Sequence, residues 1–336
     1  MTVYRPVFDV TVGDARVSNV DPTSPEGALS SITVFSSRRP EADTARLEFP
    51  YDVEGLDIST FSEGDEVAIA LGNVPGISAE TVFVGEVVTI GPDKPVWLEC
   101  RDALHQLGKE PVNKVYKNVG PGDIGAVVAE LAGSGVGVEM GDVPPQFKLK
   151  RFRCDHCTPR FALRELAAKV GVDFYAVPGQ KKVYFGYPFA ELVGRQDFVP
   201  VFEYGLNILD EGTLAYREKS PVGQVVVYGV DAAFKERTVK AVYPKAAGEG
   251  PARTFELEGA DEKAAAEEAE RRYLELASSR YEGSCTTLGR GDTRHSMRCK
   301  VEDPRQPARS LHAYIESVTH RCGRSYKMEV EVGHGA

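Results

Sequence analysis

The sequence predicts a β-rich α+β fold in which two small antiparallel β-barrel domains flank an α+β module. The first observation is that apolar residues alternate with polar ones over most of residues 43–107, the pattern of strands that place one face on a core. The second is that Gly, Pro, Asn and Asp separate these short runs, as tight turns between antiparallel strands require. The third is that helical spacing is confined to a middle region and to residues 261–279.

Residues 1–105 are expected to form the first barrel. Residues 4–12 alternate as a strand, Gly13-Asp14 marks a turn, and Val17–Val20 should pair back as a hairpin. After a Pro-containing loop, residues 28–36 form the next strand. The remaining strands are carried by four alternating apolar runs: Leu47 and Phe49; Val67, Ile69 and Leu71; Val82, Val84 and Val87; and Val96 and Leu98.

Residues 106–195 are expected to form the α+β module, as a helix-and-hairpin unit that is used twice. The first helix follows Asp123, a favourable N-cap residue, and its apolar residues have the spacing i, i+3, i+4, i+7. The second helix begins after Thr158 and ends at Gly171, since glycine suits the left-handed position that closes a helix. A hairpin over 173–186 then completes the module.

Residues 196–336 are expected to form the second barrel. Residues 261–279 are the clearest helix in the chain, because acidic residues in the first turns suit the helix dipole and alanine favours helix formation. Alternating runs surround this helix on both sides. The last four predicted strands are 281–288, 295–303, 310–319 and 325–333.

Fragments of the first barrel occur in an order that resembles a known family. They are Asp-x-Ala-x-Leu-x-Phe at 43–49, Phe61 in an amphipathic link, Gly-Asp-x-Val-x-Ile at 64–69, Val-Phe-x-Gly-x-Val at 82–87 and Cys-x-Asp at 100–102. This order resembles the first tail-tube-like barrel of the baseplate hub proteins of phage tails and contractile injection systems, the late-control D-like family. The Thr-Pro-led helix and the last hairpin also resemble hub proteins, whereas residues 140–160 match nothing in the family.

Composition and charge exclude several other classes. The chain has 336 residues, of which 42% are hydrophobic, so it is long enough for two or three domains and is not expected to be disordered. A net charge of −10 argues against nucleic acid bound on an exposed basic surface. No apolar run is long enough to cross a bilayer and no signal-peptide pattern is visible, so we expect no stable membrane association. The six cysteines are expected to be reduced thiols.

The sharpest chemical motif is Cys154-Asp155-His156-Cys157. Two thiols at this spacing form half of a zinc site or a redox pair. A structural zinc needs two further ligands, but the chain has no second Cys-x-x-Cys, and its other histidines are scattered over His105, His295, His312, His320 and His334. We therefore predict no metal and no functional disulfide, and we interpret the motif as a loop before a helix.

The remaining motifs favour structural interpretations. Arg290-Gly291-Asp292 matches an adhesion tripeptide but is expected to be a turn between strands. Gly133, Gly135 and Gly137 precede a strand rather than a helix, which argues against a phosphate-binding loop. The basic residues of 148–153 alternate with apolar ones, which is typical of an exposed strand face. We therefore predict no catalytic, cofactor-binding or metal-binding residues and no enzymatic activity.

The resemblance and the two barrels together imply a structural role. Three copies of a chain with two similar barrels present six barrels to a sixfold tail tube and remain threefold toward a spike. The expected assembly is a homotrimeric baseplate hub in the virion tail, assembled in the host bacterial cytoplasm without a cofactor. Its expected partners are the tail tube protein on one side and the spike protein on the other. A tape-measure protein is a candidate contact, and DNA is expected only as transiting cargo.

Two other classes stay open at this point. A β-rich hydrolase would need convergent acidic residues in a cleft, and a carbohydrate-binding or receptor-binding tail protein would expose aromatic residues on loops, whereas the single tryptophan, Trp97, lies in a predicted strand. The charge adds a hypothesis: acidic residues line the channel of the ring and keep DNA sliding, with Glu63, Asp65 and Glu66 as candidates. The competing interpretation is that the charge only aids solubility.

Overall fold

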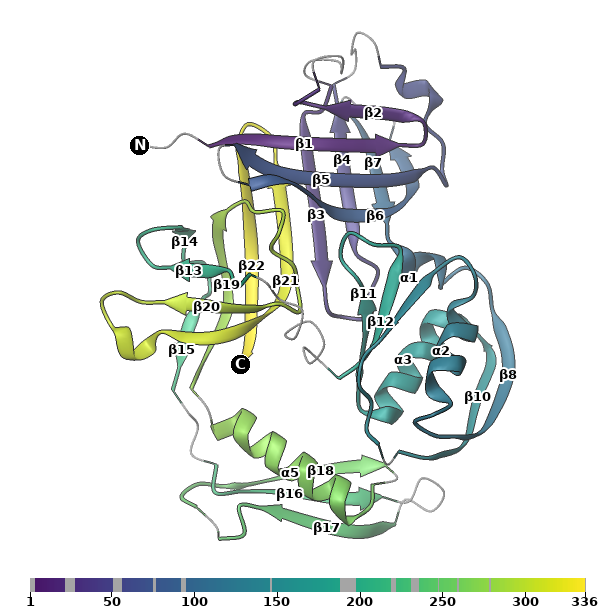
Figure 1. Cartoon of the computed structure of the whole chain (residues 1–336), viewed down its shortest axis with the longest axis vertical. Coiled ribbons are helices and arrows are strands. Elements are labelled where there is room, and N and C mark those ends of the chain that lie inside the picture. Colours follow the sequence, from purple (N-terminus) through teal and green to yellow (C-terminus); the bar gives the residue numbers. More distant parts are fainter. Residues whose placement is uncertain are drawn as a thin grey trace.

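The computed structural model describes most of the 336 residues, and its strands and helices form four groups, each with its own hydrophobic core (Figure 1). None of the described helices is both long and apolar enough to cross a membrane. The described residues are 4–21, 28–50, 56–74, 77–91, 95–145, 147–187, 198–218, 222–230, 236–246, 248–258, 260–277 and 279–335.

The first group, the first sheet module, is a strongly curled antiparallel sheet. Residues that alternate along its strands, such as Val10, Leu47 and Phe83, are buried in one common core. A short 3₁₀ helix, Ile58–Thr60, and a short helix, α1 (Ala103–Gln106), accompany the sheet. Its strands are β1 (Arg5–Val12), β2 (Ala15–Ser18), β3 (Ser31–Ser37), β4 (Thr44–Phe49), β5 (Glu66–Val74), β6 (Ile77–Gly91) and β7 (Val96–Arg101).

The second group, the middle module, packs two helices between two small sheets (Figure 1). Thr158 caps helix α3 by accepting a hydrogen bond from the Phe161 backbone N–H, and Gly171 ends the helix with φ +80°. The two sheets pair β8 with β10, and β11, β12 and β9. The elements are β8 (Val112–Val119), α2 (Ile124–Ala132), β9 (Gly137–Met140), β10 (Leu149–Cys157), α3 (Pro159–Val170), β11 (Asp173–Ala176) and β12 (Lys182–Gly186).

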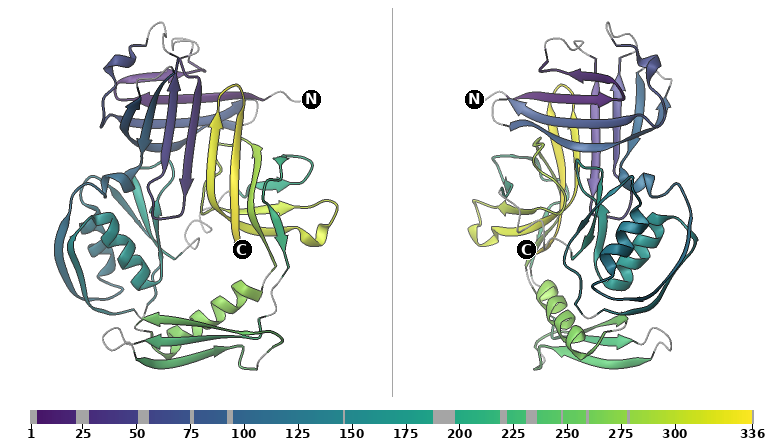
Figure 2. Two further views of the ribbon diagram at one scale, coloured as in Figure 1. Left: turned by 180° about the vertical axis from the view of Figure 1, so that it is seen from behind. Right: turned by 45° about the vertical axis from the view of Figure 1, so that its right-hand side comes forward.

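The last part of the chain forms two groups. The second sheet module comprises β13 (Val201–Glu203), β14 (Ile208–Asp210), β15 (Ala215–Arg217), β19 (Arg280–Leu288), β20 (Arg298–Glu302), β21 (Leu311–Cys322) and β22 (Tyr326–Gly335), with a 3₁₀ turn at Pro307–Arg309. The peripheral unit is inserted between β15 and β19 and comprises β16 (Gln224–Val230), β17 (Arg237–Tyr243), β18 (Ala252–Glu258) and α5 (Glu262–Ala277). Helix α5 covers one face of the three peripheral strands (Figure 2).

The two sheet modules are joined edge to edge into one continuous sheet of fourteen strands. The joint is the antiparallel pairing of β3 with β21, in which Ile32–Ser37 face Ser317–Cys322. The core is continuous across this joint, because Cys322 and Tyr326 of the second sheet module pack into the core of the first. The modules therefore meet through backbone hydrogen bonds and shared apolar contacts, not through a flexible linker.

The two sheet modules also share a strand order. In the first, neighbouring strands run β5-β6-β7-β4-β3, and in the second they run β20-β21-β22-β19-β15. In each module three consecutive strands form an antiparallel meander, whose third strand pairs with the earlier strand β4 or β19. The outer strands differ, since β1 pairs antiparallel with β5 whereas β13 pairs parallel with β20.

The structure confirms a β-rich α+β fold, but it corrects two expectations. No sheet of the described residues closes into a barrel: β2 and β3 do not pair, so the first sheet module is an open curled sheet. The helix-and-hairpin unit is not repeated, because α2 is followed by the single strand β9, which pairs in parallel with β12. Strand β8, which the sequence did not indicate, pairs with β10. The domain boundaries at 105/106 and 195/196 remain predictions.

Candidate functional site

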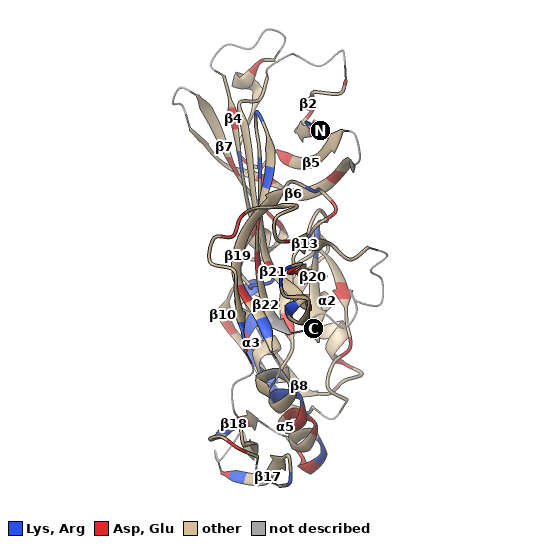
Figure 3. Ribbon diagram, turned by 90° about the vertical axis from the view of Figure 1, so that its left-hand side faces the viewer, with Lys and Arg blue, Asp and Glu red and all other residues tan. Residues whose placement is uncertain are grey.

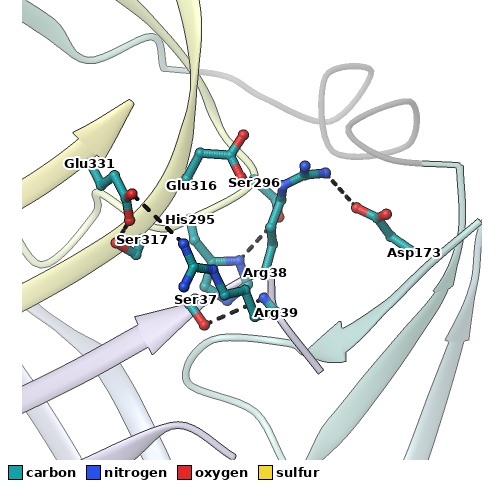
Figure 4. Close-up of polar contacts among 9 residues, drawn as sticks. All are labelled: Ser37, Arg38, Arg39, Asp173, His295, Ser296, Glu316, Ser317 and Glu331. Atoms are coloured by element: carbon teal, nitrogen blue, oxygen red, sulfur yellow. Dashed lines mark hydrogen bonds and ion pairs between the residues drawn. The ribbon is translucent and has the colours of Figure 1, made fainter. Parts of the chain in front are cut away.

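The contact between the three large modules is centred on Arg38, which directly follows β3 (Figure 4). Its Nε lies 2.5 Å from Oε2 of Glu316 on β21, and its Nη1 lies 2.6 Å from Oδ2 of Asp173 on β11. The side chain of Arg38 is only 17% exposed. Burial works against its charged form, but Asp173 and Glu316 outweigh this effect and raise its pKa. One guanidinium group therefore ties together all three modules.

A bulge in β21 aims Glu316 at this arginine. The pairing of β21 with β22 shifts register between Ile315 and Ser317, which makes Glu316 the extra residue of the longer strand. The Arg38 backbone N–H also donates to the Glu316 carbonyl, at 3.1 Å. On the neighbouring strand, Glu331 accepts a hydrogen bond from the Ser317 hydroxyl at 2.7 Å and lies 3.8 Å from Arg39 (Figure 4).

A buried histidine reaches the same contact from the loop between β19 and β20. The Nδ1 of His295 lies 3.0 Å from the hydroxyl of Ser296, whose φ of +64° places it in the left-handed region. The imidazole packs edge-on against Tyr175 of β11, with ring centroids 5.2 Å apart. Burial lowers the pKa of His295 to about 3, so this histidine is neutral.

Two buried carboxyl groups lie on the first sheet module, and one of them, Asp43, lies close to this histidine. Asp43 accepts a hydrogen bond from the Ser37 backbone N–H at 2.8 Å, and its Oδ2 is 4.0 Å from Nε2 of His295. Asp102 accepts from the Leu104 backbone N–H at 3.0 Å and so caps α1. Burial raises the pKa of Asp102 to about 7, and burial together with repulsion from Asp102 raises the pKa of Asp43.

These side chains form a packed contact rather than an open cleft. Asp43 and Asp102 adjoin a hollow of only about 10 Å³, which is about the size of one water site, under the turn that joins β11 to β12. The chemistry available here is ion pairing and proton exchange between buried groups. The described residues hold no group of three or more His, Cys, Asp or Glu side chains placed to bind a metal ion.

The motifs that the sequence singled out lie apart from one another in the structure. The interpretation of the Cys-x-x-Cys motif as a loop was wrong, because Cys154, which is buried, and Cys157, which is half-buried, lie on strand β10 just before α3. Both are free thiols. Burial raises the pKa of Cys154 to about 11, which keeps this thiol protonated and unreactive at neutral pH. The absence of a metal and of a functional disulfide stays a prediction, and elemental analysis that finds about one zinc per chain would contradict it.

The adhesion-like tripeptide is a turn, as expected. Arg290 binds Asp292 through two hydrogen bonds of 3.0 and 2.8 Å, so the two charges of the tripeptide are paired with each other. Gly291 packs against the backbone of β5, where a Cβ atom would lie 2.0 Å from the Leu71 carbonyl oxygen. Asn73 anchors the same loop by donating to the Gly289 carbonyl at 2.6 Å. The tripeptide therefore helps to dock the second sheet module onto the first.

The other singled-out residues have separate positions. Gly133 ends α2, and the backbone N–H of Gly137 at the start of β9 bonds the Lys181 carbonyl, so these glycines serve helix and strand geometry. The basic run at 148–153 lies largely on β10, in the two-stranded sheet with β8. Glu66 forms an ion pair with Lys181 of the middle module, at 2.8 Å.

The residues of the module contact could not be predicted from the sequence. Arg38 is separated from Asp173 by 135 positions and from Glu316 by 278, and no local pattern marks such a pairing. A weak signal did exist for the two buried carboxyl groups. Asp43 begins the first hub-like fragment and Asp102 ends the last one, and aspartates at the ends of apolar strands are unexpected unless they cap or pair.

Comparisons with known proteins identify the fold. No protein-family model matches this sequence, and no curated protein does. A tail protein from Neisseria meningitidis MC58 is similar in structure, with a TM-score of 0.64 and 14% identity over 98% of this chain and 96% of that chain. The 43 kDa tail protein of prophage MuSo2 from Shewanella oneidensis gives 0.60 and 14% over 97% of each chain.

A secretion-system protein is similar as well. The Escherichia coli protein c3393, described as a type VI secretion component that resembles the T4 tail proteins gp27 and gp5, gives a TM-score of 0.58 at 10% identity, over 97% of this chain and 77% of that one. At these identities the similarity shows the fold alone. The fold is that of phage tail proteins and their secretion-system counterparts, which confirms the resemblance to baseplate hub proteins.

Proposed function

We propose that this chain is a non-enzymatic structural component of a phage-type tail, a baseplate hub that forms a homotrimeric ring between a sixfold tail tube and a threefold spike. The observation that carries the proposal is the edge-to-edge joint of two modules with the same strand order. Such a joint is head-to-tail, because the edge of β3 in one module meets β21 of the other. Head-to-tail contacts that repeat with a closing rotation generate rings.

The same kind of joint can form between two chains, and the shared strand order indicates which strands would form it. In the shared strand order, β15 of the second sheet module takes the place of β3, and β6 of the first takes the place of β21. The edge of β19 that carries β14 and β15 ends the sheet. On β6, pairing with β5 extends only to Glu86, which leaves residues 88–91 without a strand partner on that edge in the described chain. We place the contact between protomers there, and three chains then give six modules.

Exposed apolar residues at the free end of the sheet support this placement. Leu206, in the turn before β14, is 70% exposed, and Leu209 of β14 is 48% exposed. Apolar side chains grouped at the open edge of a sheet favour a further protein surface over solvent. The contact should be a large one, since permanent assemblies bury extensive apolar area.

Mass in solution tests the ring. Light scattering should give three copies of the 36.6 kDa chain, about 110 kDa. Leu206→Glu combined with Leu209→Glu should yield folded monomers, because charged groups would then be buried in the contact. Leu274→Glu is the matched control, since Leu274 is 58% exposed on α5, away from the proposed contact. A monomeric unmodified chain at micromolar concentration would refute the ring.

The proposed partners follow from this position in a tail. A tail tube protein would bind one end of the ring and a spike protein the other, with a tape-measure protein or DNA passing through. The protein would be assembled in the host bacterial cytoplasm and would reside in the virion tail. A hydrolase gains no support, since the buried carboxyl groups of Asp43 and Asp102 adjoin a hollow of only about 10 Å³. A carbohydrate-binding protein gains none either, since Trp97 lies under Arg46, 4.5 Å from its guanidinium carbon, on a strand rather than a loop. Imaging of the assembled particle tests the location.

A further inference from the structure

A cationic hollow lies at the tip of the β21–β22 hairpin, on the face of the continuous sheet that is turned away from the cores. Its volume is about 370 Å³. Three cationic side chains line it: Arg321 at the end of β21, Arg324 in the turn and Lys327 at the start of β22. Hydroxyl groups that can donate hydrogen bonds complete the lining, from Thr33 and Thr286.

The strand register places two of the cations directly opposite each other. Arg321 faces Lys327 across the β21–β22 pair, and Arg321 also faces Thr33 across the β21–β3 pair. Like charges at directly opposite positions destabilise a sheet. An arrangement that costs stability is expected where an anion offsets the repulsion, so the pair indicates a binding site.

The acidic residues nearby neutralise only one of the three cations that line this hollow. Glu329 lies one row further along the sheet and forms an ion pair with Arg321, at 3.0 Å. Glu48 accepts hydrogen bonds from Ser31 and Arg46, and these bonds lower its pKa. Within the described chain, neither Arg324 nor Lys327 has an acidic partner at ion-pair distance. Positive charge is thus left unpaired in a protein whose formal net charge is −10.

We propose that the cationic hollow, lined by Arg321, Arg324 and Lys327, binds the carboxylate side chains of an acidic segment of a partner protein. The surroundings favour discrete carboxylates over a nucleic acid. A duplex spans many sheet rows and would meet Glu48, Glu329 and Glu331 on the same face. A carboxylate side chain places its charge at one point, which suits a hollow of this volume, and arginine binds carboxylates in a two-pronged geometry.

Fluorescence anisotropy with three probes tests the proposal. The probes are a labelled peptide of six alternating aspartate and glutamate residues, the same peptide made of asparagine and glutamine, and a 20-base-pair DNA duplex. We expect the acidic peptide to bind and the neutral one not to bind. Arg324→Glu and Lys327→Glu should each weaken acidic-peptide binding at least tenfold. Arg305→Glu is the matched control, because Arg305 is exposed on a distant loop, and it should change binding less than twofold.

A stability measurement separates loss of the site from loss of the fold. Lys327→Glu places an acid opposite Arg321, so this variant should unfold at a higher urea concentration than the unmodified protein while it loses the peptide. Equal peptide binding by the variants and the unmodified chain, or no peptide binding at all, would overturn the proposal. So would a duplex that binds more tightly than the peptide and is lost in the same variants.

Discussion

Arg38 is the residue on which the contact between modules depends most directly. Its removal leaves the half-buried carboxylates of Asp173 and Glu316 without their cation, and an uncompensated buried charge is costly. We expect Arg38→Met to lower the free energy of unfolding by about 3 kcal/mol. Urea unfolding followed by circular dichroism measures this. The matched control, Arg305→Met at an exposed position, should stay within about 0.5 kcal/mol.

A compensated variant shows whether charge is the cause. Arg38→Met combined with Asp173→Asn and Glu316→Gln removes the stranded charges along with the cation, so it should recover part of the lost stability. If the triple variant is less stable than Arg38→Met alone, packing of the arginine rather than its charge holds the modules together.

Folding shifts the pKa values of Asp102 and His295 in opposite directions. Unfolded, Asp102 titrates near its ordinary pKa of 3.8 and His295 near 6.5; folded, their pKa values are about 7 and about 3. Between about pH 4 and pH 6.5 the unfolded chain therefore carries the proton on the histidine, and the folded chain carries it on the aspartate. The two linkage effects have opposite signs, so they largely cancel over this window.

Asp102→Asn removes one of these two opposing pH effects and should reveal the other. A carboxyl group with a raised folded pKa stabilises the protein at low pH, and its contribution is lost as pH rises from about 4 to about 7. The stability of the asparagine variant relative to the unmodified protein should therefore increase over that range, by more than about 1 kcal/mol. Asparagine still caps α1, and Arg160 and Asp43 remain in place. Urea unfolding at steps of half a pH unit measures this change in relative stability.

An exposed aspartate provides the matched control. Hydrogen bonds from the side chain and backbone of Ser59 lower the pKa of Asp57, so this carboxyl group is ionised in both the folded and the unfolded chain above about pH 5. The difference between Asp57→Asn and the unmodified protein should accordingly be flat from pH 5 to pH 7. A flat profile for Asp102→Asn as well would show that Asp102 is ionised in the folded protein.

At the scale of elements, the sequence predicted the strands and helix ends that depend only on residues close together in the chain. Period-two alternation located the strands of both sheet modules, and the Thr158 cap with the Gly171 stop located α3. Strand β8 was missed because most of its residues are at least partly exposed and polar, so no alternation marks it. The repeat of the middle module was misjudged because the pairing of β9 with the distant β12 is a tertiary choice. The β3–β21 joint depends on partners hundreds of residues away, and sheet closure depends on how the whole sheet curls, so no local pattern encodes either.

The β6–β7 hairpin offers a test of close packing within one element. Gly91 lies opposite Trp97, and a Cβ atom at position 91 would be 2.0 Å from the indole Cε2. Gly91→Ala should therefore displace the indole from its place beneath Arg46 and destabilise the protein by about 1–3 kcal/mol. Because Trp97 is the only tryptophan, its fluorescence maximum reports the displacement directly.

The control for this substitution is another glycine. Gly122 is exposed, and a Cβ atom there meets nothing within 4 Å, so Gly122→Ala should leave the Trp97 fluorescence unchanged. An unshifted emission maximum in Gly91→Ala would mean that the strand backbone, rather than the indole, gives way.

At the scale of the whole molecule, the uncovered face of the continuous sheet bears on the hypothesis of an acidic channel. Residues of both charge signs occur along the continuous sheet (Figure 3). On this face they form close pairs: Arg46 with Glu48 at 2.9 Å, Arg101 with Glu99 at 2.9 Å, and Arg321 with Glu329 at 3.0 Å. Of the candidates named from sequence, Glu66 contacts Lys181 and Asp65 accepts from the Ser62 backbone N–H. If this face lines the channel of the proposed ring, charge pairing rather than net acidity keeps DNA from adhering.

Neutralising the acidic partners on this face tests that idea. Glu48→Gln, Glu329→Gln and Glu331→Gln together leave Arg46, Arg321 and Arg39 without their carboxylates. Unpaired arginines bind phosphates and release counterions, so this variant should bind a 20-base-pair duplex at least tenfold more tightly than the unmodified protein at low salt, and should lose it steeply as salt rises.

A variant of equal net charge distinguishes the face from the total charge. Glu218→Gln, Glu236→Gln and Glu249→Gln change the charge by the same amount at exposed positions away from this face. If DNA binding responds to total charge, both triple variants should bind alike. If the charge pairs on this face are what keep DNA from adhering, only the variant of Glu48, Glu329 and Glu331 should bind the duplex. Tight duplex binding by the unmodified protein would rule out a face adapted to let DNA slide.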